Sequence, residues 1–368
     1  VIIQHYPEFI ETYIKDDIEK SNFYQPFLNK PKHINEDAFT SYQQQAKAII
    51  KDSINPVYRK FKVFMVNDYL PNARDSLGAY SLPNGKAYYQ QQIKEYTTLD
   101  LTAEEIHQIG LQEAKRIRGE MEAIIESLAF DGSFADFLHF LRTDPQFYAE
   151  TADELLSEAR DISKRMDGKL PELFTHLPRQ PYAVNPVPAG IAPNYTTGRY
   201  VPAPLDSTRP GQFWVNTYAL EKRPLYNLEA LTFHEAVPGH HLQGALTKEL
   251  KHLPKFRQNA YISAFGEGWG LYCEKLAKEV GFYQDPYADF GRLTYEMWRA
   301  MRLVVDAGIH AMGMSRDEAI KLMEENSAIS KHNVRTEIDR YIAWPAQALS
   351  YKLGEIKIWE LRRKAEKE

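Results

Sequence analysis

The chain has 368 residues, of which 43% are hydrophobic and 26% charged, as expected for a globular protein with a sizeable core. Its formal net charge of −5 leaves no basic excess to neutralise phosphates, which argues against a general nucleic-acid-binding protein. The single cysteine, Cys273, excludes intramolecular disulfides and a cysteine-rich zinc site, so any metal must be held by histidines and carboxylates. No run approaches the ~20 apolar residues that span a bilayer, so the sequence predicts no transmembrane segment.

Residues 1–168 are predicted to form a helical half. In chain order, apolar residues at helical intervals predict short helices packed on a larger body over residues 1–75, and longer helices over 103–128, 134–142 and 152–166. Thr102 and Glu105 form a capping box that opens the first long helix. Pro31 and Pro56 are expected to interrupt the short helices, because proline lacks the backbone N–H that a helix interior requires.

Residues 169–222 have a different character, because prolines recur too often for long helices and predict loops with short strands. Gln212 to Thr217 has the aromatic and β-branched content of a strand, and Ile191 to Tyr200 is its possible antiparallel partner. We expect this small antiparallel sheet to lie beside a deep cleft that long helices wall on both sides.

Residues 223–368 are predicted to be helical again. The expected helices cover residues 229–246, 261–280, 289–312, a segment capped by Ser315, and 345–367. No internal repeat or low-complexity linker separates the two halves. The sequence therefore predicts one mainly α catalytic unit, 1–368, with a small sheet.

The stretch from Thr232 to Gln243 places three histidines and a carboxylate within eight positions, a density that packing alone does not require. It is comparable with the H-E-x-x-H pattern, in which two histidines hold Zn²⁺ and the glutamate acts on water. By this comparison His234 is a metal ligand and Glu235 the general base. The competing interpretation is a helix end capped by histidines.

The second histidine depends on the backbone after Glu235. Position i+4 from His234 is Pro238, so an unbroken helix would present no second imidazole. Pro238 and Gly239 favour a bulge or break, which would bring His240 round to the metal. His241 would lie about 10 Å further along a regular helix and stays the alternative second ligand.

A third ligand is expected downstream, because catalytic zinc usually takes three protein ligands. Glu267 and Glu274 are seven residues apart and share one face of a helix. We select Glu267, because the glycines around it let another helix approach closely, whereas Glu274 begins a charged pair with Lys275 and is expected to be solvated. Such a set of nitrogen and oxygen ligands also suits Mn²⁺, Co²⁺ or Ni²⁺.

His-Glu and Gly-His followed by a glutamate on a second helix resembles the glutamate-zincin metallopeptidases, which include angiotensin-converting enzyme, thimet oligopeptidase and carboxypeptidase Taq. Their motif is shorter, so the match is by roles. A closer resemblance is to the bacterial domain of unknown function 885 family. It rests on the segments Leu82 to Tyr89, Arg209 to Thr217, His234 to Gln243, Glu267 to Trp269, and Asp339 to Tyr351.

The resemblance implies a multi-helix peptidase-like fold and a Zn²⁺ cofactor. Short, unfolded peptides are the expected substrates, because long helices are expected to wall a deep cleft that only a flexible chain could enter. The resemblance also implies a donor for the developing oxyanion, for which Tyr341 and Tyr351 are the candidates, with packing as their alternative role. Arg340, or as a second choice Arg209, could hold a substrate carboxylate, although either could serve as an ordinary ion-pair partner. The predicted strand that includes Asn216 would align an extended peptide.

The leading hypothesis is a zinc-dependent metallopeptidase of dipeptidase, carboxypeptidase or oligopeptidase type. The alternatives are a metal-dependent hydrolase of a non-peptide amide, or a non-catalytic peptidase-like binding protein, which the intact Glu235 disfavours. The resemblance implies the bacterial periplasm or an envelope lipoprotein, with the cytoplasm as the alternative. Val1 to His5 has neither a Met nor signal-peptide features, so the sequence is expected to be trimmed at its N-terminus.

Overall fold

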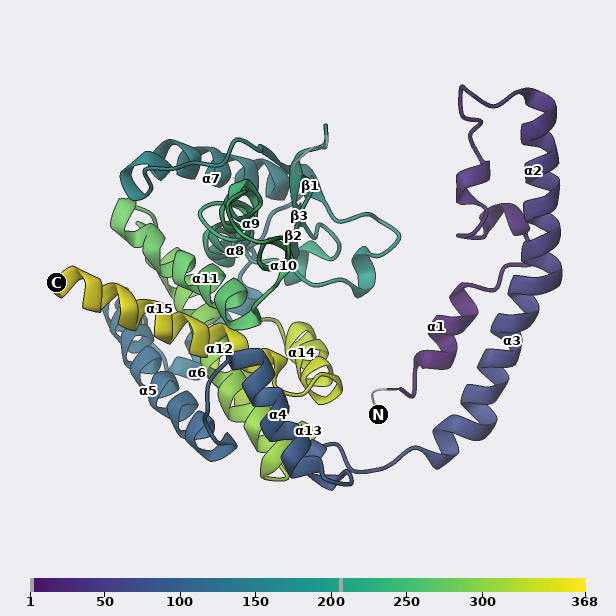
Figure 1. Ribbon diagram of the computed structural model, residues 1–368. Helices are drawn as coiled ribbons and strands as arrows, with labels where there is room; N and C mark the ends of the chain where they lie inside the picture. Colours follow the sequence, from purple (N-terminus) through teal and green to yellow (C-terminus); the bar gives the residue numbers. More distant parts are fainter. Residues whose placement is uncertain (1–2, 205–207) are drawn as a thin grey trace. The chain divides into compact units, whose positions relative to one another are not determined.

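The computed structural model describes residues 3–204 and 208–368. Val1 and Ile2 lie outside this described part. They belong to the segment Val1 to His5, in which the sequence shows no signal-peptide features. The chain forms two compact units, Val1–Ser76 and Leu77–Glu368 (Figure 1). The division falls inside the predicted helical half, and residues 169–222 and 223–368 belong to one unit.

The first unit is helical, as its apolar periodicity predicts. Its α-helices are α1 (Tyr6–Thr12), α2 (Glu36–Ile49) and α3 (Asn55–Phe64). Two π-helical turns, Ile50–Ile54 and Met65–Tyr69, follow α2 and α3, so residues 36–69 form one continuous helix. The prediction that Pro56 interrupts the helices was therefore wrong. Pro56 lies in the first turn of α3, directly after a π-helical turn, where the altered hydrogen-bond spacing accommodates a residue without an N–H.

A long helix, α12 (Pro286–Ala311), forms the centre of the second unit. Every residue from Phe290 to His310 is buried, charged residues included. It packs along α5 (Ala103–Ser127). At Gly110 the two helices are so close that any side chain there would collide with Leu303. The start of α5 confirms the predicted capping box.

The described residues form a sheet of three strands, β1 (Tyr182–Pro186), β2 (Gly198–Val201) and β3 (Gly211–Val215), in the order β1-β3-β2. The predicted antiparallel pairing is confirmed for β2 and β3, in which Tyr200 lies opposite Phe213. The prediction of a purely antiparallel sheet was wrong, because β1 pairs with β3 in parallel. The connection from β1 to β3 is long enough to contain β2, and it therefore allows β1 and β3 to run in the same direction.

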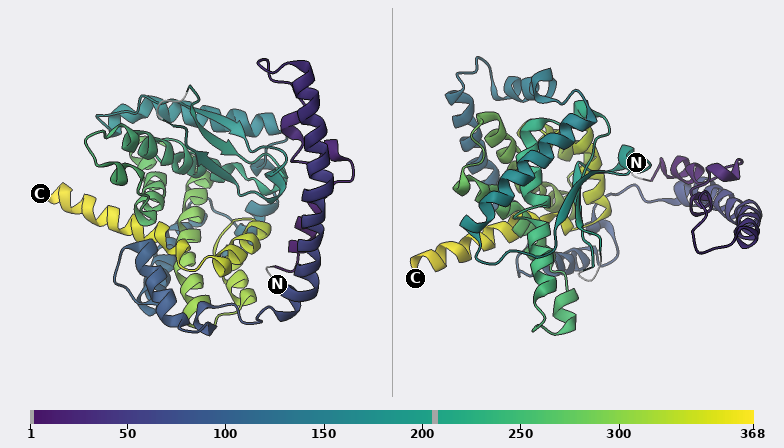
Figure 2. Two further views of the ribbon diagram at one scale, coloured as in Figure 1. Left: turned by 45° about the vertical axis from the view of Figure 1, so that its right-hand side comes forward. Right: turned by 90° about the horizontal axis from the view of Figure 1, so that it is seen from above.

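The other helices of this unit are α4 (Gly85–Thr97), α6 (Phe134–Thr143), α7 (Ala152–Leu173), α8 (Leu228–Glu235), α9 (His240–Glu249), α10 (Lys255–Asn259), α11 (Ser263–Leu276), α13 (Arg316–Asn326), α14 (Lys331–Ala343) and α15 (Ser350–Lys367). The predicted helix 229–246 is thus two helices, α8 and α9. The last turns of α15 project from the body of the unit (Figure 2). No helix in the described ranges is both long and apolar enough to cross a membrane.

Candidate metal centre

The candidate site is organised by the break between α8 and α9. Helix α8 ends at Glu235, Ala236 leaves the helical conformation with ψ −111°, and α9 begins at His240. Gly239 permits this path, because a Cβ there would lie 2.0 Å from the carbonyl oxygen of His234. The predicted interruption of the helix is therefore confirmed. It turns the chain so that His240 faces the ring of His234, with ring centroids 4.7 Å apart.

Three side chains from three helices converge at this break. Nε2 of His234 lies 3.7 Å and Nε2 of His240 lies 3.4 Å from Oε2 of Glu267 on α11. One donor atom of each residue lies within 4.8 Å of the others, which makes the three a possible metal-binding group. The structure thus brings together the ligand set predicted from the sequence.

His241 points elsewhere. Its buried ring lies against Tyr182 and Tyr200 of the sheet, with centroids 4.7 and 5.4 Å apart, and Nδ1 is 3.1 Å from the Tyr200 hydroxyl. Burial lowers the pKa of His241 to about 4, so its imidazole is neutral near pH 7. The alternative second ligand is therefore turned toward the sheet and does not join His234 and Glu267.

Glu274 supports the site from behind, contrary to the prediction that it is solvated. Its side chain is buried, and Oε1 accepts a hydrogen bond of 2.8 Å from Nδ1 of His234. Because an ionised carboxylate only accepts, the Nδ1 proton is fixed and Nε2 is left directed at Glu267 and His240. Arg299 lies 3.6 Å from the same carboxylate oxygen. Packing of α11 against α8 buries Glu274. The sequence does not indicate this burial, because the neighbouring Lys275 suggests a solvated charged pair.

The electrostatics of the cluster favour positive charge. Burial alone would raise the pKa of Glu267, but hydrogen bonds from His234 and His240 hold it well below the ordinary value. Burial lowers the pKa of His234, yet its bonds to Glu267 and Glu274 raise it to about 9. The carboxylates of Glu267, which is half-buried, and Glu274, which is buried, therefore favour positive charge at the imidazoles.

Glu235 adjoins the cluster at the end of α8. Its side chain is half-buried, and Oε2 accepts a 2.7 Å hydrogen bond from the backbone N–H of Tyr200 in β2. Since β2 pairs with β3 on its other side, this contact places Glu235 at the edge of the sheet. The carboxylate predicted as the base thus lies next to the candidate ligand His234 and is held by an edge strand.

The two predicted tyrosines differ in position. The ring of Tyr351 is stacked on His234, with centroids 6.2 Å apart and an interplanar angle of 20°. Tyr341 is buried, and its hydroxyl accepts hydrogen bonds from Trp298 (2.9 Å) and Arg302 (2.7 Å). A third tyrosine, Tyr261, was missed by sequence reasoning and donates a 3.1 Å bond to Oε1 of Glu267. Of the predicted pair, Tyr351 is the one beside the candidate ligands.

A family model of bacterial proteins of unknown function (DUF885) matches residues 2–368. The chain belongs to the DUF885 family. This confirms the closer resemblance seen in the sequence and leaves the likeness to the glutamate zincins as a prediction. No curated protein matches the chain.

Two solved structures resemble this DUF885 member. One is described as "the putative lipoprotein from Colwellia psychrerythraea" and is 34% identical, with a TM-score of 0.93 over 99% of this chain. The other, "a putative lipoprotein of unknown function from Shewanella oneidensis", is 18% identical, with a TM-score of 0.69 over 98% of this chain, and shows the fold alone. The present chain spans 63% and 64% of their lengths, respectively. Neither description names an activity.

The predicted substrate-binding residues of this DUF885 chain are dispersed. Arg340 on α14 donates to Glu337 (3.0 Å) and to Gln347 (2.7 Å). Arg209 lies exposed in the turn before β3. Asn216 is buried at the end of β3, where its amide group donates to three backbone carbonyls between Ala192 and Thr196. Asn216 therefore secures the loop before β2.

Replacing Glu274 by Gln is expected to weaken metal binding by roughly 10–100-fold, the usual cost of losing an outer partner of a histidine ligand. The amide can still accept from Nδ1 but no longer supplies the negative charge behind His234. Zinc affinity should be measured by competition with a chromogenic chelator. Glu279→Gln, an exposed carboxylate one turn beyond α11, is the matched control. Equal affinities for Glu274→Gln and the parent would contradict the support role.

Gly270 on α11 makes room for the first ligand, because a Cβ there would lie 2.6 Å from the imidazole of His234. We expect Gly270→Ala to displace this ring and reduce zinc affinity at least tenfold, since overpacking forces neighbouring side chains from their positions. The control is Gly168→Ala in α7, where a Cβ meets no atom within 4 Å. That change should keep zinc binding and stabilise the helix by about 0.5–1 kcal/mol. Unaltered zinc affinity in Gly270→Ala would disprove the steric argument.

Proposed function

We propose that this protein is a zinc-dependent hydrolase of short peptides, with His234, His240 and Glu267 as metal ligands and Glu235 as the general base. The observation that carries the proposal is the convergence of the three ligand groups across the α8–α9 break, with Glu235 beside them. The donor set suits zinc, whose catalytic sites usually combine three histidine and carboxylate ligands. The distances between the donor atoms also suit zinc. Ligands about 2.1 Å from one tetrahedral ion lie about 3.4 Å apart, and Oε2 of Glu267 lies 3.7 Å from Nε2 of His234 and 3.4 Å from Nε2 of His240.

A bound divalent ion supplies Lewis acidity, which polarises the substrate carbonyl and makes water a nucleophile near neutral pH. Glu235 accepts the proton of the attacking water and delivers it to the nitrogen of the leaving amine, so no external acid is needed. Tyr351, stacked on His234, is the better placed of the two predicted tyrosines to donate to the developing oxyanion. Tyr341 is less suitable because its hydroxyl already accepts two hydrogen bonds.

Short peptides are the proposed substrates because an edge strand borders the site. Within residues 3–204 and 208–368, β2 pairs only with β3, and on its other edge the N–H of Tyr200 reaches Glu235. An extended peptide can align along such an edge through main-chain hydrogen bonds. The descriptions of the two similar structures as lipoproteins further support an envelope location.

The proposal is tested by incubating the zinc-loaded protein with a mixture of short synthetic peptides and following fragments by mass spectrometry. We expect cleavage that a chelator abolishes and that added zinc restores. Cleavage of non-peptide amides alone would favour the alternative hydrolase. Stoichiometric zinc binding with no turnover of either class would favour the non-catalytic alternative.

A further inference from the structure

The connection from α9 to α10 forms a projecting tip on the second unit (Figure 2). Residues 250–257, here called the α9–α10 tip, run from Leu250 to Arg257 and include the start of α10. The structure describes all of residues 250–262, and none of them is buried. Both α9 before this stretch and α11 after it do bury side chains. The tip is therefore presented to its surroundings and is not packed on the core.

The α9–α10 tip carries only positive formal charge. Lys251, Lys255 and Arg257 are exposed, and no Asp or Glu occurs from Lys251 to Gly266. Within the described ranges none of these three side chains forms an ion pair or a hydrogen bond. The whole chain has a net charge of −5, so the tip differs in sign from the rest of the molecule. Such a local excess of positive charge attracts an anionic partner.

Large apolar side chains are exposed at the same tip. Phe256 is 72% exposed and Leu250 is 41% exposed. Leu177, also 41% exposed, belongs to a neighbouring segment, in which the backbone N–H of Arg179 donates a 2.9 Å hydrogen bond to Glu249. Apolar surface is unfavourable in water, so its combination with unpaired cations on a projecting element indicates a surface that binds a partner.

The small size of the tip favours a lipid bilayer over a protein as this partner. A stable protein interface usually takes about 20–30 residues from each side, whereas the tip comprises the eight residues 250–257. A bilayer surface needs no complementary shape, because apolar side chains enter the headgroup region while Lys and Arg stay at anionic headgroups. Cations and a phenylalanine on a projecting tip satisfy both requirements.

We propose that the α9–α10 tip docks the protein on a bilayer that contains anionic phospholipids. Lys251, Lys255 and Arg257 contact the headgroups, and Phe256 enters the layer between them. The docking requires neither metal nor turnover, so it goes beyond the proposed hydrolase function. It keeps the candidate metal centre near the bilayer, because Tyr261, which follows α10, donates a 3.1 Å hydrogen bond to the candidate ligand Glu267.

Co-sedimentation of the full chain with vesicles tests the proposal. The vesicles contain phosphatidylcholine alone or phosphatidylcholine mixed with anionic phosphatidylglycerol. We expect binding to the mixed vesicles at low salt and release at about 1 M salt, where the Debye length falls to about 3 Å. The variant Lys251→Gln/Lys255→Gln/Arg257→Gln should bind the mixed vesicles roughly 100-fold more weakly, at about fivefold for each cation removed. Phe256→Ser should weaken binding at low salt as well, because it removes the inserted side chain.

The matched control removes three exposed cations from other helices of the same unit, Lys86→Gln/Lys115→Gln/Arg160→Gln on α4, α5 and α7. It changes the net charge of the chain equally and should bind vesicles nearly as well as the parent. Equal losses in the two triple variants would show an effect of net charge alone and would overturn the proposal. A parent chain that ignores the mixed vesicles at low salt would also overturn it, and binding of soluble poly-glutamate in that case would identify an acidic protein partner.

A single-site fluorescent label tests which part of the molecule meets the lipid. The one cysteine, Cys273, is buried, so a cysteine added at an exposed position can be labelled selectively. We expect the dye NBD at His252→Cys, in the tip, to shift its emission to the blue with mixed vesicles. The same dye at His139→Cys, an exposed position on α6, should not respond. Vesicle binding without a response at His252→Cys, or with equal responses at both positions, would reject docking through the tip.

The docking and hydrolase proposals fail separately. All vesicle measurements are made in a chelator and without peptide. Vesicle binding by a chain that hydrolyses no peptide would sustain the docking and reject the hydrolase. Metal-dependent hydrolysis by a chain that does not bind anionic vesicles would sustain the hydrolase and reject the docking.

Discussion

Glu235→Gln is expected to lower the hydrolysis of short peptides by roughly 10²–10⁴-fold while zinc binding and folding are preserved, because general-base catalysis contributes about this much. Gln keeps the shape of the side chain, and its carbonyl oxygen can still accept the hydrogen bond from the N–H of Tyr200. It cannot take up a proton from water. Steady-state rates on a cleaved peptide, together with zinc content and thermal unfolding of the same preparation, provide the measurement.

The control for this variant is Glu221→Gln, which changes an exposed carboxylate between β3 and α8. It should retain the parent rate. A Glu235→Gln protein that turns over peptides like the parent would remove Glu235 from the mechanism. Loss of zinc together with activity would show that Glu235 acts on the metal site and not on the water.

The break that positions His240 could be predicted because its cause is local. Pro238 cannot donate the hydrogen bond that continues α8, and Gly239 tolerates a path that would press any Cβ against the His234 carbonyl. The capping box at Thr102 and Glu105 was predictable for the same reason, since the two residues satisfy each other's backbone groups. Features of this kind depend on a few neighbouring residues.

The role of Glu274 could not be predicted in this way. Its burial depends on how α11 packs against α8 and α12, and its charged neighbour Lys275 suggested exposure. The usable signal was its spacing from Glu267, since two carboxylates seven residues apart on one helix face can meet the same histidine. That spacing identified both carboxylates and did not distinguish the ligand from its supporting partner.

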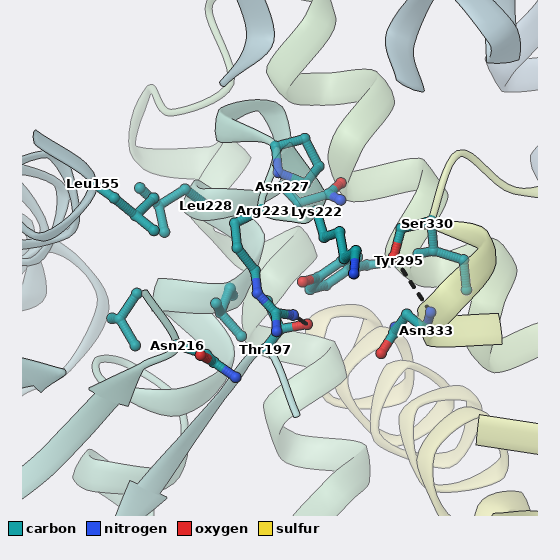
Figure 3. A pocket seen from close by; sticks show the side chains of 14 residues that line it. Leu155, Thr197, Asn216, Lys222, Arg223, Asn227, Leu228, Tyr295, Ser330 and Asn333 are labelled. Carbon is teal, nitrogen blue, oxygen red and sulfur yellow. Dashed lines mark hydrogen bonds between the residues drawn. The ribbon is translucent and has the colours of Figure 1, made fainter. Parts of the chain in front are cut away.

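The burial of Arg223 and the parallel pairing of β1 depend on residues that are distant in the sequence. Only the folded chain shows that Arg223 is buried, in the wall of the small pocket drawn in Figure 3. β1 follows Pro181 and ends at Pro186, two prolines that weaken any strand pattern, and its pairing is set by contact with β3. Tertiary contacts therefore decide both features.

The largest loss of metal binding is expected for the double variant His234→Ala/Glu267→Ala. The parent should bind about one zinc ion per chain. The double variant should lose more affinity than the roughly 10–100-fold expected for Glu274→Gln, because it removes two of the three ligands and not only a hydrogen-bond partner of one ligand. Zinc content after loading and dialysis is measured by elemental analysis. As a second readout, saturating zinc at about 100 times its dissociation constant should stabilise the parent by about 2.7 kcal/mol and leave the double variant unchanged.

Single variants decide which histidine completes the ligand set. His240→Ala should lose most zinc affinity, because its Nε2 lies 3.4 Å from Glu267. His241→Ala should keep it, because that ring faces Tyr182 and Tyr200 of the sheet. The exposed His252→Ala controls for nonspecific zinc binding by surface imidazoles. Undiminished binding in the double variant would reject the proposed ligands altogether, whereas loss in His241→Ala with retention in His240→Ala would place the ion on the sheet side of the α8–α9 break.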